Sequence, residues 1–173
     1  MLLLTNLKYV LWMVILIFFQ VAIFNNINFY GYANPYIYVI FILLYPLDKN
    51  KYIFLIAAFI LGLSIDFFEH TGGVNAFAAV FVAYFRYYIV QLIHFRKTYE
   101  SEEIKLGNLS LIQWVIYMAI IIYIHHFLVY FMDSFIFDFI GSIAYKSLLG
   151  AGLTFILTSA FLLFFPIEEK SEY

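Results

Sequence analysis

The chain alternates long apolar runs with short polar connections, and its basic residues concentrate in every second connection. Most of its nine Lys and Arg residues lie before the first run, between the second and third, after the fourth, or after the last, as Lys8, Lys49, Lys51, Arg96, Lys97, Lys105 and Lys170. The intervening connections, residues 25–34 and 69–73, contain none. Basic residues in short loops near span ends stay on the cytoplasmic side of a membrane. The pattern therefore predicts six membrane spans with both termini in the cytoplasm.

Composition points to the same class of protein. Hydrophobic residues make up 66% of the chain, compared with about 45–50% in soluble domains. The predicted fold class is an all-α polytopic membrane protein, and 173 residues leave room for one helical bundle without a separate soluble domain. Cysteine is absent, which excludes disulfides, thiol catalysis and thiolate metal sites. No basic groove accompanies the many aromatic residues, so we expect them to face lipid and we expect no nucleic-acid partner.

We expect the six spans at residues 9–24, 33–47, 52–68, 74–95, 111–132 and 147–165 of a single domain, residues 1–173. The second span is short, because a hydrocarbon core of about 30 Å takes roughly 20 helical residues. Its predicted start has Asn34 as the N-cap and Pro35 at the first helical position, and Pro46 lies near its end. Residues 134–146 place apolar and polar side chains on opposite helical faces, which predicts an interfacial helix before the last span.

The third and fourth spans each carry a face of small residues that ends in a charged one. On the third span the face consists of Ala58, Gly62 and Asp66, and on the fourth of Ala76, Ala79, Ala83 and Arg86. Small residues allow two helices to approach closely, so we predict that these faces pack together, and ordinary packing is the simplest role for the alanines. An ionised group at membrane depth costs at least about 2.5 kcal/mol on insertion scales, so Asp66 and Arg86 are expected to be functional.

Two cations, Arg86 and Lys146, are candidate ionic partners of Asp66. If the chain turns near Thr71, Asp66 and Arg86 lie at depths that differ by roughly 15 Å at 1.5 Å per residue. Lys146, at the start of the last span, lies closer in depth, and we predict that it pairs with Asp66. Arg86 is then expected nearer mid-membrane, where it could bind helix-end carbonyls, polar groups of the fifth span or a partner protein.

The sequence contains no catalytic motif, and we predict neither enzymatic activity nor a cofactor. His125 and His126 could form a metal site together with His70 and Glu69. Adjacent histidines point about 100° apart on a helix, so both cannot easily bind one ion. We therefore predict no metal and expect His125 and His126 to form hydrogen bonds at the membrane interface.

The third and fourth spans also carry a family resemblance. Residues 62–76 read GLSIDFFEHTGGVNA, and residues 83–86 read AYFR. These segments resemble the G-L-x-x-D-x-x-x-x-x-x-G-x-x-A…Y-x-R pattern of MreD, the membrane subunit of the bacterial rod-shape system, in the style of Bacteroidota. Gly73, Asn75 and Ala76 lie within the first segment, and Pro46-Leu47-Asp48 before a basic loop also fits. Tyr87 departs from the pattern, since many relatives have Pro after the arginine.

The resemblance implies a non-enzymatic scaffold in the bacterial cytoplasmic (inner) membrane that helps to determine cell shape. Its implied partners are MreC and, through MreC, MreB filaments, RodA and a transpeptidase of peptidoglycan elongation. It also implies a six-helix fold similar to the substrate-binding subunits of energy-coupling-factor vitamin transporters. Asp66 in the first segment and Arg86 in the second occupy the family's polar positions.

The alternative function is a substrate-binding subunit of a small-molecule transporter of the vitamin type. Such a site should show a cluster of hydrogen-bonding side chains in the outer half of the bundle. Asn75, His125, His126 and Asp66 are the only obvious candidates in the sequence, so the scaffold is favoured. An enzyme that acts on a lipid is a third interpretation, which no motif supports.

Cysteine labelling tests the predicted topology, because the chain contains no native cysteine. We expect an impermeant thiol reagent, added outside intact cells, to label single cysteines at positions 30 and 71. Cysteines at positions 50 and 103 should react only after the cells are opened. The reverse pattern would contradict the orientation taken from the basic residues.

Overall fold

The structure is a computed structural model that describes residues 2–27, 34–94, 106–134 and 140–164, and these residues form helices and no strand. Five of the helices are long and apolar enough to cross a membrane: α1 (Leu2–Ala22), α3 (Lys51–Glu69), α4 (Val74–Ile93), α5 (Leu111–Ser134) and α6 (Ile140–Phe164). The short helices are α2 (Val39–Leu44) and the single turns η1 (Phe24–Asn26) and η2 (Leu106–Asn108). The chain is therefore an all-helical protein with several potential membrane helices.

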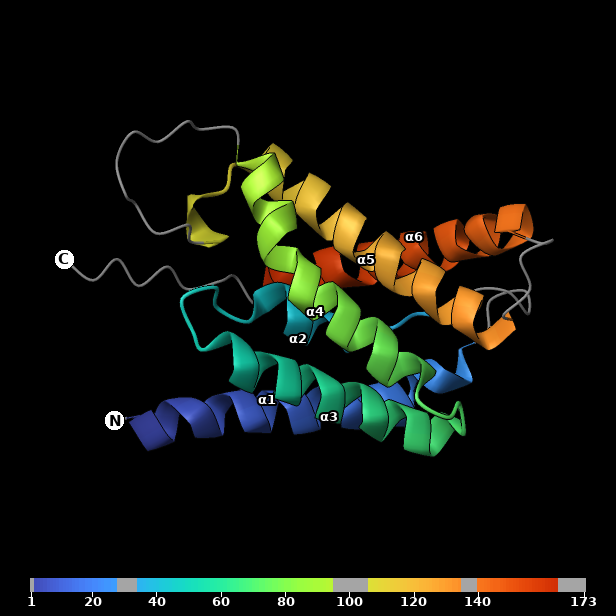
Figure 1. Ribbon diagram of the computed structural model, residues 1–173, viewed down its shortest axis with the longest axis horizontal. Helices are drawn as coiled ribbons and strands as arrows, with labels where there is room; N and C mark the ends of the chain where they lie inside the picture. Colours follow the sequence, from blue (N-terminus) through green and yellow to red (C-terminus); the bar gives the residue numbers. More distant parts are fainter. Residues whose placement is uncertain (1, 28–33, 95–105, 135–139, 165–173) are drawn as a thin grey trace.

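The five long helices run from one end of a bundle to the other (Figure 1). We call the end with the α2–α3 connection the Lys49 end, and the end with the α3–α4 corner the Gly73 end. Helices α3, α4, α5 and α6 each pack against the next in chain order, and α1 packs against α3. Because α1 and α3 both run from the Lys49 end to the Gly73 end, the chain between them returns along the bundle (Figure 1). Residues 34–47 make this return.

The returning segment is less helical than the sequence predicts. The expected helix at residues 33–47 is reduced to the six residues of α2, which begin after Tyr38, so the prediction of Asn34 as the N-cap is wrong. The side chains of residues 36–43 are almost completely buried. Buried backbone that is not helical is tolerated where neighbouring protein groups satisfy its N–H and C=O groups. Side chains from four other helices do so here, as described below.

The start of α6 also differs from the prediction. Ile140 and Lys146 belong to one continuous helix of 25 residues, so residues 140–146 are the first turns of the long helix and not a separate interfacial helix. No proline interrupts the segment, and the hydroxyl of Ser147 donates to the carbonyl of Ile143 at 2.7 Å, which satisfies a buried polar group within the helix. The remainder of the predicted interfacial helix, residues 135–139, lies outside the described residues.

Three residues with positive φ make the tight corner between α3 and α4. His70 adopts the left-handed conformation at φ 58°, and its N–H and that of Thr71 both donate to the carbonyl of Asp66. Gly72 and Gly73 follow at φ 65° and 103°, values that glycine adopts without steric cost. The chain therefore reverses within a few residues, and the two helices lie side by side.

Gly62 brings α3 and α4 into backbone contact. A Cβ atom at this position would lie 2.5 Å from the Cα of Ala76 and 2.6 Å from the carbonyl oxygen of Asn75. Ala58 and Ala79, on the facing sides of the two helices, are fully buried. The small faces expected from the sequence therefore do face the interior of the bundle.

Gly62→Ala should destabilise the protein, because the methyl group would push α4 away from α3. Overpacking of this kind costs about 1–3 kcal/mol. Gly152→Ala is the matched control, because a Cβ there meets nothing within 4 Å and alanine is the better helix former. Thermal unfolding in detergent should show a lower midpoint for Gly62→Ala and an equal or higher one for Gly152→Ala. Equal midpoints for the wild type and Gly62→Ala would refute the close contact.

Candidate functional site

Asp66 caps the N-terminus of α4 although it belongs to α3. Its Oδ1 accepts the backbone N–H of Asn75 at 2.9 Å, and its Oδ2 accepts that of Ala76 at 2.8 Å. These N–H groups are the ones that an N-cap side chain normally satisfies, and the N-cap residue here is Gly73, which has no side chain. The hydroxyl of Thr71 also donates to Asp66 Oδ1. The carboxylate is thus stabilised by hydrogen bonds and by the positive end of the α4 dipole.

These contacts correct the prediction that Asp66 pairs with Lys146. Within the described part of the chain the ion pair is Asp48 with Lys49, at 3.9 Å on the exposed surface. Neither Lys146 nor Arg86 is among the groups bonded to Asp66. The sequence argument assumed that a buried carboxylate requires a cation, whereas the start of a helix supplies donors of its own.

Asn75 connects this corner to the bundle interior. Its amide nitrogen lies within hydrogen-bonding distance of Glu69 Oε2 at 2.8 Å and of Asp66 Oδ1 at 3.2 Å. Its amide oxygen accepts the hydroxyl of Tyr38 at 2.9 Å. The same hydroxyl lies 2.8 Å from Nε2 of His125. The single hydroxyl proton of Tyr38 is donated to Asn75. In the contact with His125 the hydroxyl oxygen must therefore be the acceptor, and Nε2 of His125 carries the proton that it donates to Tyr38.

Arg86 holds the C-terminal end of α2. Its side chain is 2% exposed, and its two terminal nitrogens donate to the carbonyls of Ile42 and Tyr45. The guanidinium carbon also lies 4.4 Å from the ring centre of Phe54. The hydroxyl of Tyr117 donates to the neighbouring carbonyl of Leu43 at 3.2 Å. Of the three roles considered for Arg86, binding to helix-end carbonyls is the one that the structure shows.

Gln20 and Thr154 hold the non-helical residues before α2. The side-chain oxygen of Gln20 accepts the N–H of Ile37 at 2.7 Å, and its nitrogen donates to the carbonyl of Pro35 at 3.0 Å. The hydroxyl oxygen of Thr154 accepts the N–H of Tyr36 at 3.1 Å. Gln20 and Thr154 are both completely buried, so water cannot replace these contacts.

The two histidines of α5 lie in the interior of the bundle, and their hydrogen bonds are formed with groups of the protein. Both are 0% exposed. Nδ1 of His126 donates to the carbonyl of Ile122 at 2.9 Å, and its Nε2 accepts the hydroxyl of Thr154 at 3.1 Å. Gly150 leaves room for the ring, since a Cβ there would lie 2.8 Å from it. His125 contacts Tyr38 instead, so the adjacent rings bind different segments, the residues before α2 and the helix α6.

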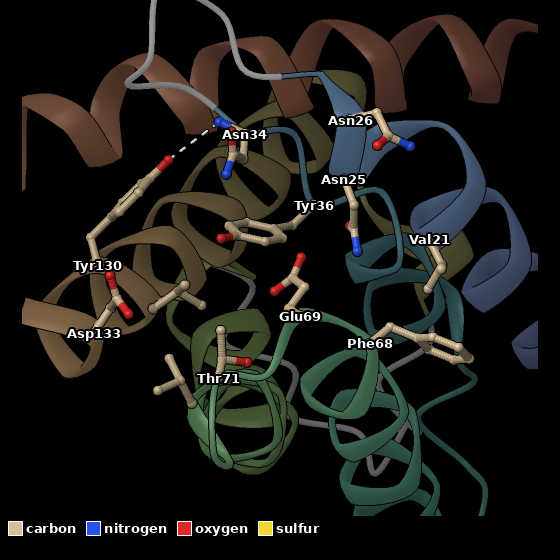
Figure 2. A pocket seen from close by; sticks show the side chains of 12 residues that line it. Val21, Asn25, Asn26, Asn34, Tyr36, Phe68, Glu69, Thr71, Tyr130 and Asp133 are labelled. Atoms are coloured by element: carbon tan, nitrogen blue, oxygen red, sulfur yellow. Dashed lines mark hydrogen bonds between the residues drawn. The ribbon is translucent and has the colours of Figure 1, made fainter.

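A cavity of about 530 Å³ opens at the Gly73 end, between the ends of α1, α3 and α5 and the segment before α2 (Figure 2). Its lining consists of Val21, Asn25, Asn26, Asn34, Tyr36, Phe68, Glu69, Thr71, Val74, Val129, Tyr130 and Asp133. Figure 2 shows the Glu69 carboxylate pointing into the space below the ring of Tyr36. The corner that Asp66 builds therefore forms one wall of a polar cavity.

Sequence reasoning missed most of this site. It did not consider Gln20 as a site residue, although Gln20 lies within an apolar run and is buried. It also overlooked a face of α6 on which small and hydroxyl side chains recur, at Ser147, Gly150, Thr154 and Thr158, all of them buried. Polar residues in membrane helices usually face the protein interior, so both signals were available in the sequence.

Compared with known protein families, curated proteins and solved structures, the chain matches none.

Arg86→Lys should destabilise the protein, because one ammonium group cannot reproduce the two separate donors of the guanidinium. Leaving a buried carbonyl without a donor costs about 1–3 kcal/mol. Titration with SDS from a mild detergent should reveal earlier unfolding of Arg86→Lys. Tyr87→Phe is the control, because Tyr87 is the exposed neighbour on the same helix. If Arg86→Lys and Tyr87→Phe both unfold at the same SDS fraction as the wild type, the stability of the protein does not depend on the bonds from Arg86 to the α2 carbonyls.

Proposed function

We propose that the chain is a non-enzymatic membrane scaffold subunit of the MreD type, which helps to determine cell shape as part of the cell-wall elongation complex. One observation carries this proposal: the residues that make up the MreD-like pattern form joints between helices. Asp66 caps α4, Gly62 lies against the backbone of Ala76, and Arg86 binds the end of α2. Residues with such roles fix the shape of a bundle, which is what a scaffold requires.

A six-span arrangement in the bacterial inner membrane belongs to this proposal. Because α1 and α3 run in the same direction, residues 34–47 supply the sixth traverse of the bundle (Figure 1). Lys49 and Lys51 at one end would face the cytoplasm, together with both termini. A fold similar to the substrate-binding subunits of energy-coupling-factor transporters is part of the same hypothesis.

Within this proposal, the buried hydroxyl–imidazole pair of Thr154 and His126 is structural. Thr154 and His126, at 3.1 Å, are the hydroxyl and imidazole that most resemble a nucleophile and its base. Both are completely buried, and the Thr154 oxygen also accepts the N–H of Tyr36. The pair is inaccessible to a substrate and has a clear structural role, so it does not favour an enzyme.

The cavity at the Gly73 end favours a second candidate, the substrate-binding subunit of a small-molecule transporter. The sequence suggested few hydrogen-bonding groups for such a site, but the cavity gathers amides, hydroxyls and carboxylates from four segments. The scaffold stays the main proposal because the patterned residues themselves face other helices and not the cavity.

Purification from the native membrane tests the choice between the two. A scaffold of this type should retain an MreC-type protein and, through it, MreB, RodA and a transpeptidase, and its depletion should convert rods into rounded cells. A transporter subunit should instead retain ATPase and coupling subunits, and its loss should leave cell shape unchanged. Asp66→Ala should reduce both partner recovery and thermal stability, while Asp48→Asn, an exposed change at the other end, should alter neither. Normal shape and full partner recovery in Asp66→Ala would remove the role assigned to this residue.

A further inference from the structure

The cavity at the Gly73 end has the size and position of a ligand site. Its volume of about 530 Å³ falls within the range of roughly 300–1,000 Å³ that small-molecule sites occupy. Its walls are formed by the ends of α3 and α5, the turn η1 and the buried segment before α2.

The central group of the cavity is a carboxylate with spare bonding capacity. Glu69 is half-buried, and its Oε2 accepts the amide of Asn75 at 2.8 Å. No described residue bonds to its Oε1, and the carboxylate points into the open space (Figure 2). Since a carboxylate oxygen can accept more than one hydrogen bond, Glu69 can bind a donor from a ligand.

The surroundings of Glu69 favour a positively charged ligand. Asp133 provides a second carboxylate in the lining, and both Asp66 and Asp133 act electrostatically on Glu69 with the same sign of charge. None of the described residues that line the cavity is Lys or Arg. Like charges in a partly buried space repel one another, and a bound cation would relieve this repulsion.

The remaining polar groups narrow the chemistry to a cation that donates hydrogen bonds. Asn34 lines the cavity, and its Oδ1 is buried without a hydrogen-bond partner in the described part of the chain. Tyr36 and Phe68 add aromatic rings, which attract ammonium groups. A bare metal ion fits less well, because the described residues contain no group of three or more His, Asp or Glu side chains that could hold one.

We propose that this cavity binds a ligand with an ammonium group, and that Glu69 and Asp133 are its counter-ions. The ammonium group can come from a free amine or from the headgroup of a lipid such as phosphatidylethanolamine. This role is separate from scaffolding, since the residues that line the cavity do not occupy the named positions of the MreD-like pattern. They are connected to that pattern through hydrogen bonds, from Thr71 to Asp66 and from Asn75 to Glu69.

The soluble source is tested with spermidine on the purified full chain in a non-ionic detergent. We expect a saturable rise in the thermal midpoint with spermidine, and no rise with triethylene glycol, an uncharged chain of comparable length. For the lipid source, phosphatidylethanolamine or phosphatidylglycerol is added to the same micelles. Only phosphatidylethanolamine should raise the midpoint if the headgroup is the ligand.

Three variants decide whether the cavity is responsible. Glu69→Gln removes the charge but retains an oxygen that can accept the Asn75 amide, and Asp133→Asn removes the second charge at an exposed position. Each should weaken the apparent affinity for the active probe at least about tenfold, as expected for loss of a charged hydrogen bond. Asp48→Asn changes the net charge equally at the Lys49 end and should bind as the wild type does.

The two arms distinguish the source of the ammonium group, and a response in either one that depends on both carboxylates supports the proposal. The absence of a response in both arms would overturn it. So would a response that Glu69→Gln and Asp133→Asn leave unchanged. If Glu69→Gln unfolds without ligand, Asp133→Asn still decides the outcome, because its side chain lies on the surface.

Discussion

The structure depends on how its buried, partly non-helical segment satisfies its backbone polar groups. Residues 35–38 and the short helix α2 are buried in the bundle, where their N–H and C=O groups have little access to water. Each unsatisfied group would cost several kcal/mol in such surroundings. Gln20 and Thr154 bind the leading residues, and Arg86 binds the carbonyls at the far end. These side chains come from α1, α6 and α4, so the segment fixes the relative positions of helices that are distant in sequence.

The same requirement explains the α3–α4 corner. Gly73 permits the left-handed turn but cannot cap the helix that follows, and Asp66 supplies the missing acceptor from the preceding helix. The turn at Gly73 and the cap by Asp66 therefore form the corner together. Asn75 extends it in two directions, toward Glu69 in the cavity and toward Tyr38 in the buried segment. The cavity wall and the buried segment thus share one hydrogen-bonded network.

The sequence correctly predicted those structural features that depend on hydrophobic periodicity and side-chain size. The helices α3, α4 and α5 lie within two residues of the expected ranges, and the small faces of α3 and α4 are buried. The patterns failed where the outcome depends on contacts between distant residues. Asn34 and Pro35 have the local features of a helix start, yet bonds from Gln20 and Thr154 hold this backbone in another conformation. Likewise, depth alone suggested Lys146 for Asp66, because the sequence does not reveal that the start of α4 lies against the carboxylate.

Charged residues lie at both ends of the bundle. Lys49 and Lys51 lie at one end together with Asp48, whereas the carboxylates Asp66, Glu69 and Asp133 gather around the other. In the orientation proposed above, the first end faces the cytoplasm and the cavity opens on the outer side of the membrane. Proteins place carboxylates together in this way only where something compensates their repulsion, and for Asp66 the compensation is the start of α4. Glu69 has one amide donor, from Asn75, and faces an open space. The fold thus satisfies the hydrogen-bonding capacity of Asp66 but only part of that of Glu69. For this physical reason we assign Asp66 to the architecture of the bundle and Glu69 to ligand binding.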